Sequence, residues 1–168
     1  MALPAGVERQ PEHRDETRAV DRAAVERLLT RRDIPLREKT LWRMLYETAA
    51  RANEILALNI EDLQLDARRA RITAKGGASE YVYWASGTAH LLPRLIRGRE
   101  HGPVFLSERR PGPARRPKAE DLCPHTGRAR LGYDRARVLL DRCTSPGQGR
   151  PGWDLLVPER RVLLQWQG

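Results

Sequence analysis

Aromatic residues and cysteines are scarce in this sequence, and long hydrophobic runs are missing. Phe, Trp and Tyr make up only 5% of the 168 residues, so a hydrophobic core must consist mainly of Leu, Val, Ile and Ala. Two cysteines, Cys123 and Cys143, are too few for a disulfide framework, and Cys123-Pro124-His125 lacks any recognised spacing of metal ligands. No signal peptide or membrane-spanning run is recognised. We therefore expect a cytoplasmic protein with reduced thiols and no membrane partner.

Lysine is also rare, because only Lys39, Lys75 and Lys118 contribute to the 31 basic residues. These 31 basic residues and 22 acidic residues give a net charge of +9. From residue 109 to the end, 13 basic and 6 acidic residues give a net charge of +7, which leaves +2 for residues 1–108. A basic half favours a polyanionic partner, most simply nucleic acid. A solvated, arginine-rich surface accounts for the charge equally well.

The first 58 residues show helical periodicity after a polar start. We expect a flexible tail over residues 1–17, followed by helices at residues 17–30, 36–49 and 52–58. Pro35 suits the first turn of the second of these helices. The apolar stripe of that helix includes Leu41, Met44 and Leu45. Its charged side chains are expected to point mostly outward: Arg37, Lys39, Arg43 and Glu47.

Strand periodicity replaces the helical pattern after residue 62. We expect strands at residues 63–65, 69–73 and 80–84, with a hairpin turn at Gly76-Gly77. Ser86 is a suitable N-cap for a helix that continues to Ile96. A Pro-, Gly- and Arg-rich loop at residues 108–130 precedes a last helix at residues 133–142. The pattern predicts an α+β fold, mainly α, in which a helical domain carries a small three-stranded antiparallel sheet.

The residues with the clearest chemical potential are Arg51, Glu54 and Lys75. The spacing of Arg51 and Glu54 places them on the same face of a helix. A guanidinium offers a planar fork of donors that fits two phosphate oxygens and can stabilise charge on a phosphorus atom under attack. Glu54 can hold that arginine in one rotamer. Lys75, beside the hairpin glycines, can reach a groove and protonate a departing oxygen.

Each of these residues also has an ordinary structural explanation. An arginine near a helix start is usually a surface charge or an ion-pair partner, here of Glu54. A lysine beside two glycines is usually a solvated turn residue. What favours a functional role is their order, because a Thr-x-x-Arg-x-x-Glu-Ile-Leu-x-Leu helix is followed by Glu-Asp-Leu and then by a hairpin with Lys-Gly-Gly.

That order resembles the tyrosine recombinase (phage integrase) family. The sequence from Thr48 to Leu63 is similar to the family segment that holds the first catalytic arginine, and Ile72 to Gly77 is similar to the hairpin that carries the catalytic lysine. The resemblance extends from about Ala23 to Trp153. It implies a C-terminal catalytic domain that breaks and rejoins DNA strands through a phosphotyrosyl link, without metal, nucleotide or small-molecule substrate. It assigns catalytic roles to Arg51 and Lys75 and a supporting role to Glu54.

The sequence departs from the family pattern after residue 155. The family continues with His-x-x-Arg and then the nucleophilic tyrosine, whereas here Arg160 and Arg161 lack the preceding histidine and Pro158 interrupts the expected helix. No tyrosine occupies the nucleophile position, although the chain has four: Tyr46, Tyr81, Tyr83 and Tyr133. We expect a truncated or frameshifted product with three parts: a tail at 1–17, a partial, C-terminally incomplete catalytic domain at 18–155 and an aberrant tail at 156–168.

The sequence therefore assigns the chain to an enzyme lineage and leaves its own catalytic activity open. The main interpretation is a catalytic-domain fragment of a site-specific DNA recombinase that is inactive alone. The alternatives are a non-catalytic basic DNA-binding module and a decayed remnant. In the main interpretation the partner is DNA, on which the chain can associate with further copies of itself.

Overall fold

The computed structural model describes residues 22–74, 76–114 and 116–144. The helices of these residues are α1 (Arg22–Thr30), α2 (Leu36–Thr48), α3 (Ala52–Ala57), α4 (Ser86–Ile96) and α5 (Tyr133–Thr144). The strands are β1 (Leu63–Gln64), β2 (Arg69–Thr73) and β3 (Ser79–Tyr83), and short 3-10 turns lie at Ile60–Asp62 and Ala119–Asp121. The predicted α+β fold with a three-stranded antiparallel sheet is confirmed. None of the described helices is long and apolar enough to cross a membrane.

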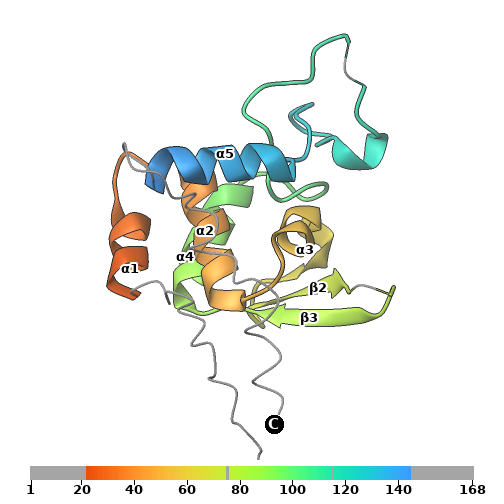
Figure 1. The fold of residues 1–168 in the computed structure, drawn as a ribbon. Coiled ribbons are helices and arrows are strands. Elements are labelled where there is room, and N and C mark those ends of the chain that lie inside the picture. Colours follow the sequence, from red (N-terminus) through yellow and green to blue (C-terminus); the bar gives the residue numbers. More distant parts are fainter. Residues whose placement is uncertain (1–21, 75, 115, 145–168) are drawn as a thin grey trace, which may run out of the picture.

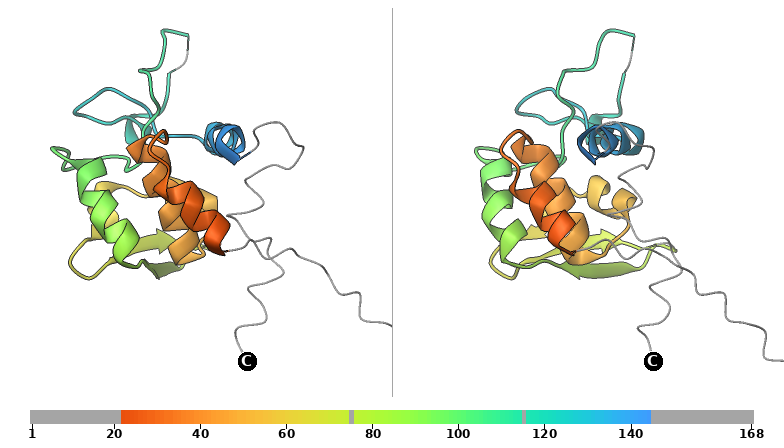
Figure 2. Two further views of the ribbon diagram at one scale, coloured as in Figure 1. Left: turned by 90° about the vertical axis from the view of Figure 1, so that its left-hand side faces the viewer. Right: turned by 60° about the vertical axis from the view of Figure 1, so that its left-hand side comes forward.

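Helix α2 is the centre of the molecule. It contacts the other four described α-helices and β3, with the sheet at one end and α5 across the other (Figure 1). Figure 2 shows α1 and α4 on different sides of α2. The apolar stripe of α2 is buried as its spacing predicts: Leu41, Trp42, Met44 and Leu45 are each at most 1% exposed. Trp42 and Phe105 are the largest fully buried side chains of the described core, in which aliphatic residues otherwise predominate.

The sheet has the order β1-β2-β3, and both pairs are antiparallel. Strand β2 begins and ends where the alternation of its side chains predicts, at Arg69 and Thr73. Ala70, Ile72 and Val82 are buried on the face of the sheet where β2 contacts α3 and β3 contacts α2, while Arg71 and Tyr81 lie opposite each other on the exposed face. The turn between β2 and β3 places both Gly76 and Gly77 at positive φ, which explains the pair of glycines there.

The N-terminus of α4 differs from its prediction. Ser86 is the first helical residue, Ala85 occupies the N-cap position, and no local side chain caps the helix. The carboxylate of Glu47 in α2 accepts hydrogen bonds from the backbone N–H groups of Ala85 (3.0 Å) and Thr88 (3.1 Å) instead. Gly87 makes this approach possible, because a Cβ there would lie 2.5 Å from Oε1 of Glu47. An acceptor from a distant helix thus replaces the serine that the sequence predicts.

The expectation that the charged residues of α2 point outward is wrong for three of them. Arg37 donates to the carbonyl of Leu106, Arg43 forms an ion pair with Glu26 of α1, and Glu47 caps α4. The side chains of Arg37 and Arg43 are both only 17% exposed. Helical spacing does not reveal such contacts, because α2 is surrounded by other elements and has no fully solvated face.

Other differences are small. Helix α5 continues two residues beyond its predicted end, to Thr144, and α3 ends one residue early, at Ala57. The predicted start of the first helix at residue 17 lies outside the described residues, as do the tails at 1–17 and 156–168. The division of the chain into three parts therefore stays a prediction.

We predict that Glu47→Ala lowers the free energy of unfolding by about 2 kcal/mol, because it leaves two N–H groups of α4 without their charged acceptor. Urea denaturation followed by circular dichroism measures the change. Glu100→Ala is the matched control, since Glu100 is exposed and should change stability by less than about 0.5 kcal/mol. Equal losses in the two variants would show that the contact does not stabilise α4.

Candidate functional site

Arg51 lies at the sharp turn between α2 and α3. Ala49 ends α2 in the left-handed conformation (φ 51°), and its N–H donates to the carbonyl of Leu45 over 3.1 Å. Arg51 itself is extended and occupies the N-cap position of α3. A non-glycine residue in the left-handed region costs about 1 kcal/mol. Packing of α2 and α3 must offset this cost, so the position of Arg51 is set by the tertiary structure as well as by its local sequence.

Glu54 contacts Arg51 in two ways. Its Oε1 lies 3.0 Å from Nη1 of Arg51, and its Oε2 accepts the backbone N–H of Arg51 over 3.0 Å. The Arg51 side chain is 50% exposed, whereas that of Glu54 is 15% exposed. The guanidinium is therefore braced on one side and open on the other. This ion pair is expected whether Arg51 is a catalytic residue or a structural one, so it does not distinguish the two. The role of Glu54 therefore stays a prediction.

The hairpin stem and α3 share a small cavity of about 280 Å³. The residues that line it are Glu54, Ala57, Leu58, Asp62, Arg71, Ile72, Thr73 and Ser79. Lys75 itself lies outside the described residues, but the turn around it is closed by hydrogen bonds from Ala74 N to Ala78 O (2.8 Å) and from Gly77 N to Ala74 O (3.0 Å). The structure therefore brings Glu54 to the stem of the predicted lysine hairpin. The convergence of Arg51 and Lys75 stays a prediction.

Arg130 holds the helix that carries this site, and the sequence analysis missed it. Its Nη1 donates to three carbonyls at the C-terminal end of α3, those of Leu56 (3.1 Å), Ala57 (2.8 Å) and Leu58 (3.2 Å). Its Nη2 donates to Oδ1 of Asn59 over 2.8 Å, and its Nε donates to Oδ1 of Asp121 over 2.7 Å. A cation at the C-terminal end of a helix also interacts favourably with the helix dipole.

Residues 102–106 connect the end of α3 to the segment that contains Arg130. Backbone hydrogen bonds join Val104 N to Leu58 O (3.0 Å) and Ile60 N to Gly102 O (2.9 Å), and Leu131 N to Phe105 O (2.9 Å). The segment that contains Arg130 is thus hydrogen-bonded to residues 102–106, and these residues are in turn hydrogen-bonded to the chain that follows α3. No local motif predicts this arrangement, because the carbonyl partners of Arg130 lie 72 to 74 residues earlier in the chain.

The described residues around the site hold neither a group of metal ligands nor a disulfide. Within the described parts of the chain, no group of three or more His, Cys, Asp and Glu residues could hold a metal ion. Cys123 is buried and has no disulfide. Burial opposes ionisation of its thiol, but hydrogen bonds from Thr126, from the backbone at His125 and from Arg99 outweigh this and lower its pKa below the usual value. Cys123 is therefore a packed residue of the described core, with polar groups of Thr126 and Arg99 near its sulfur.

Comparison with known protein families identifies the lineage. Residues 18–131 match the family model described as the phage integrase family. The chain belongs to the phage integrase family. The match includes both segments on which the resemblance rests, the turn at Arg51 and the hairpin at residues 72–77.

Solved structures of integrases and recombinases share the fold of this family member. The crystal structure of XerA recombinase matches with a TM-score of 0.59 and 14% sequence identity, over 82% of this chain and 46% of that chain. The integrase from mycobacterium phage Brujita matches with a TM-score of 0.53 and 18% identity, over 85% of this chain and 39% of that chain. The chain thus spans less than half the length of either structure. A search of curated proteins found no match.

We predict that Arg130→Lys lowers the free energy of unfolding by about 2 to 3 kcal/mol, because an ammonium cannot replace the planar fork that reaches the carbonyls, Asn59 and Asp121 together. Chemical denaturation measures the loss. Arg128→Lys is the control, since Arg128 lies in the same loop and is exposed. A loss as small as that of Arg128→Lys would contradict the role of Arg130.

Proposed function

We propose that this integrase-family chain binds duplex DNA through the face that carries Arg51, and that Arg51 contacts a phosphate of the scissile strand. The observation that carries the proposal is the half-exposed guanidinium, braced by Glu54 at the start of α3 within the family motif. A positive, planar and fixed donor group suits the non-bridging oxygens of a phosphodiester. Such a role belongs to the cytoplasm, where the chain would meet chromosomal or phage DNA.

Charge stabilisation is the chemical contribution of Arg51 in this proposal. In phosphoryl transfer, negative charge builds on the oxygens of the phosphorus under attack, and a preorganised guanidinium stabilises that charge without reorganising. Glu54 supports this role because its two oxygens hold both the guanidinium and the backbone N–H of the same residue. Arg130 supports it indirectly, by tying the other end of α3 to the loop at residues 120–130.

Lys75 would act from the neighbouring hairpin. In the sequence Lys75 follows β2. The last residue of β2, Thr73, lines the same cavity as Glu54. We propose that the ammonium of Lys75 enters a groove of DNA and protonates the departing 5′-oxygen. This chemistry uses side chains only, so we propose that it needs no metal, cofactor or small-molecule substrate. We also propose that several copies assemble on DNA.

DNA binding is tested with Arg51→Ala in a fluorescence anisotropy titration of a labelled duplex. We expect the variant to bind about five- to tenfold more weakly near 0.1 M salt, and to reduce the slope of log K against log salt by about one, because one phosphate contact is lost. The DNA affinity of Arg51→Lys should lie between those of the original protein and of Arg51→Ala, since lysine keeps the positive charge but lacks the planar fork of donors.

Arg94→Ala is the matched control for this titration. Arg94 is exposed on α4, and its side chain makes no hydrogen bond or ion pair with the described residues. It should leave affinity and salt slope within a factor of two of the original protein. Thermal unfolding by circular dichroism verifies that each variant is folded. Equal affinities of the Arg51 and Arg94 variants would contradict the proposed DNA face.

Strand cleavage by these 168 residues alone is expected to be absent. None of the four tyrosines follows a His-x-x-Arg segment: Tyr46 lies in α2, Tyr81 and Tyr83 lie on the exposed face of the sheet, and Tyr133 begins α5. A suicide-substrate assay with nicked duplexes, resolved on denaturing gels, should show no covalent protein–DNA adduct under conditions where anisotropy shows binding. A phosphotyrosyl adduct would overturn this prediction and identify a nucleophile among these tyrosines.

A further inference from the structure

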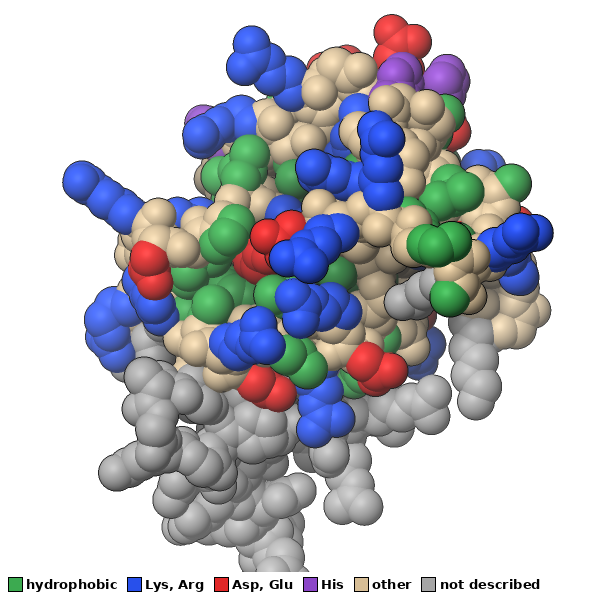
Figure 3. All heavy atoms as spheres, turned by 90° about the horizontal axis from the view of Figure 1, so that it is seen from above, with side chains coloured by type: hydrophobic (Ala, Val, Ile, Leu, Met, Phe, Trp, Pro, Cys, Tyr) green, Lys and Arg blue, Asp and Glu red, His purple; other side chains and the backbone are tan. Residues whose placement is uncertain are grey.

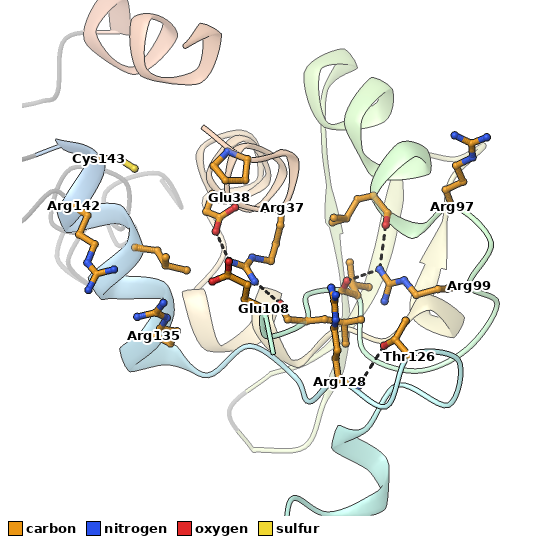
Figure 4. Close-up of a pocket in the computed structure, with 15 residues that line it drawn as sticks. Arg37, Glu38, Arg97, Arg99, Glu108, Thr126, Arg128, Arg135, Arg142 and Cys143 are labelled. Carbon is orange, nitrogen blue, oxygen red and sulfur yellow. Dashed lines mark hydrogen bonds and ion pairs between the residues drawn. The ribbon is translucent and has the colours of Figure 1, made fainter. Parts of the chain in front are cut away.

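A larger cavity, of about 580 Å³, lies at the opposite end of α2 from Arg51. Residues at the N-terminal end of α2 line it, whereas Arg51 follows the C-terminal end of the same helix. The 13 residues of α2 span about 20 Å, so the two sites are well separated. Figure 4 shows the cavity between α5, the start of α2 and the segment that follows α4.

The walls of this cavity combine arginines with an apolar floor. Six arginines line it: Arg37, Arg97, Arg99, Arg128, Arg135 and Arg142. The apolar lining includes Leu95, Val104, Leu106 and Leu139. Helix α5 supplies Arg135, Leu139 and Arg142, whose spacing of four and three residues places them on one face of the helix. Figure 3 shows the corresponding face of the molecule, with hydrophobic side chains exposed between Lys and Arg side chains.

Two of the six arginines are engaged by the protein itself. Arg37 forms an ion pair with the buried Glu38 and donates to the carbonyl of Leu106. Arg99 donates to the carbonyls of Pro103 (2.7 Å), Val104 (2.9 Å) and Leu95 (3.3 Å), which fixes the chain that leaves α4. These contacts fix the side chains of Arg37 and Arg99, so a ligand would have to be bound by the remaining arginines of the lining.

The other four arginines have no side-chain partner among the described residues. Within the described parts of the chain, no hydrogen bond or ion pair involves the guanidinium groups of Arg97, Arg128, Arg135 and Arg142. The lining contains two carboxylates, Glu38 and Glu108, of which the first is neutralised by Arg37. Six arginines and two glutamates give the lining a net charge of +4. Such a surplus, concentrated in a concave site, attracts anions.

We propose that this cavity binds a nucleoside diphosphate. Its volume lies within the range of small-molecule sites, about 300 to 1,000 Å³, and a DNA duplex does not enter a cavity of that size. Arg128 on one side of the cavity and Arg135 and Arg142 of α5 on the other offer planar donor forks of the kind that bind phosphoryl groups through bidentate contacts (Figure 4). Leu95 and Leu139, which are only partly buried, offer an apolar surface for the planar base.

The proposal separates ligand binding from DNA binding. The ligand would act as a bound effector rather than as a substrate, since the reaction proposed for Arg51 needs no nucleotide. Its site is formed by α2, α5, the segment after α4 and the loop at residues 126–128, and α2 is also the helix whose end positions Arg51. The test can therefore fail or succeed independently of the proposed recombinase role.

Isothermal titration calorimetry of the whole chain with ADP tests the site. We expect a single site with a Kd of about 100 μM or tighter. Arg135→Gln combined with Arg142→Gln should weaken binding about tenfold or more, because two charge-assisted contacts are lost. Arg137→Gln is the matched control: Arg137 lies on the same helix, does not line the cavity and should change the Kd by less than about twofold. No heat of binding at 1 mM ADP, or equal effects in the two variants, would overturn the proposal.

Two further ligands and one further variant complete the experiment. Adenosine and pyrophosphate should each bind at least about tenfold more weakly than ADP. Adenosine has no phosphate groups for the arginines, and pyrophosphate has no base for the apolar part of the lining. Pyrophosphate binding as tight as that of ADP would overturn the nucleoside part of the proposal. Arg51→Ala should bind ADP as the original protein does, even if its DNA affinity falls. If the variant lost affinity for ADP as well as for DNA, the separation of the two sites would be overturned.

Discussion

The guanidinium of Arg130 is the contact on which the arrangement of this domain depends. It reaches three carbonyls at the end of α3, the side chain of Asn59 and the carboxylate of Asp121 at the same time. A six-residue helix is too short to be stable by itself, so α3 needs contacts that hold both of its ends. Arg130 supplies the contact at its C-terminal end, while Arg51 and Glu54 form the ion pair at its N-terminal end.

Arginine is used inside this protein as a connector between distant parts of the backbone. Arg37 bonds to the carbonyl of Leu106, Arg99 bonds to three carbonyls after α4, and Arg130 bonds to three carbonyls of α3. A long side chain with five donors can satisfy several carbonyls that irregular segments leave without partners. Part of the positive charge of the chain therefore serves folding, and the net charge overstates the surface that is free to meet DNA or another anion.

The periodicity of the sequence predicts the regular elements well because their contacts are local or nearly local. Strand β2 begins and ends as predicted, since Ala70 and Ile72 alternate with exposed residues, and the glycine pair marks the turn. The start of α4 is less well predicted, because its cap comes from Glu47, about 40 residues earlier in the chain. The predicted brace between Arg51 and Glu54 is a contact across three residues, which helical spacing reveals directly.

The sequence by itself determined the fold class, the order of the elements and the family, because apolar periodicity and a motif of neighbouring residues carry all three. It also drew attention to Arg51 and Glu54, which lie within one helical turn. Only the tertiary structure decided that Arg130 holds α3, that Glu47 caps α4 and that arginines from four separate segments surround one cavity. The physical reason is that these contacts join groups far apart in the chain, and their geometry exists only once α2 has brought the surrounding elements together.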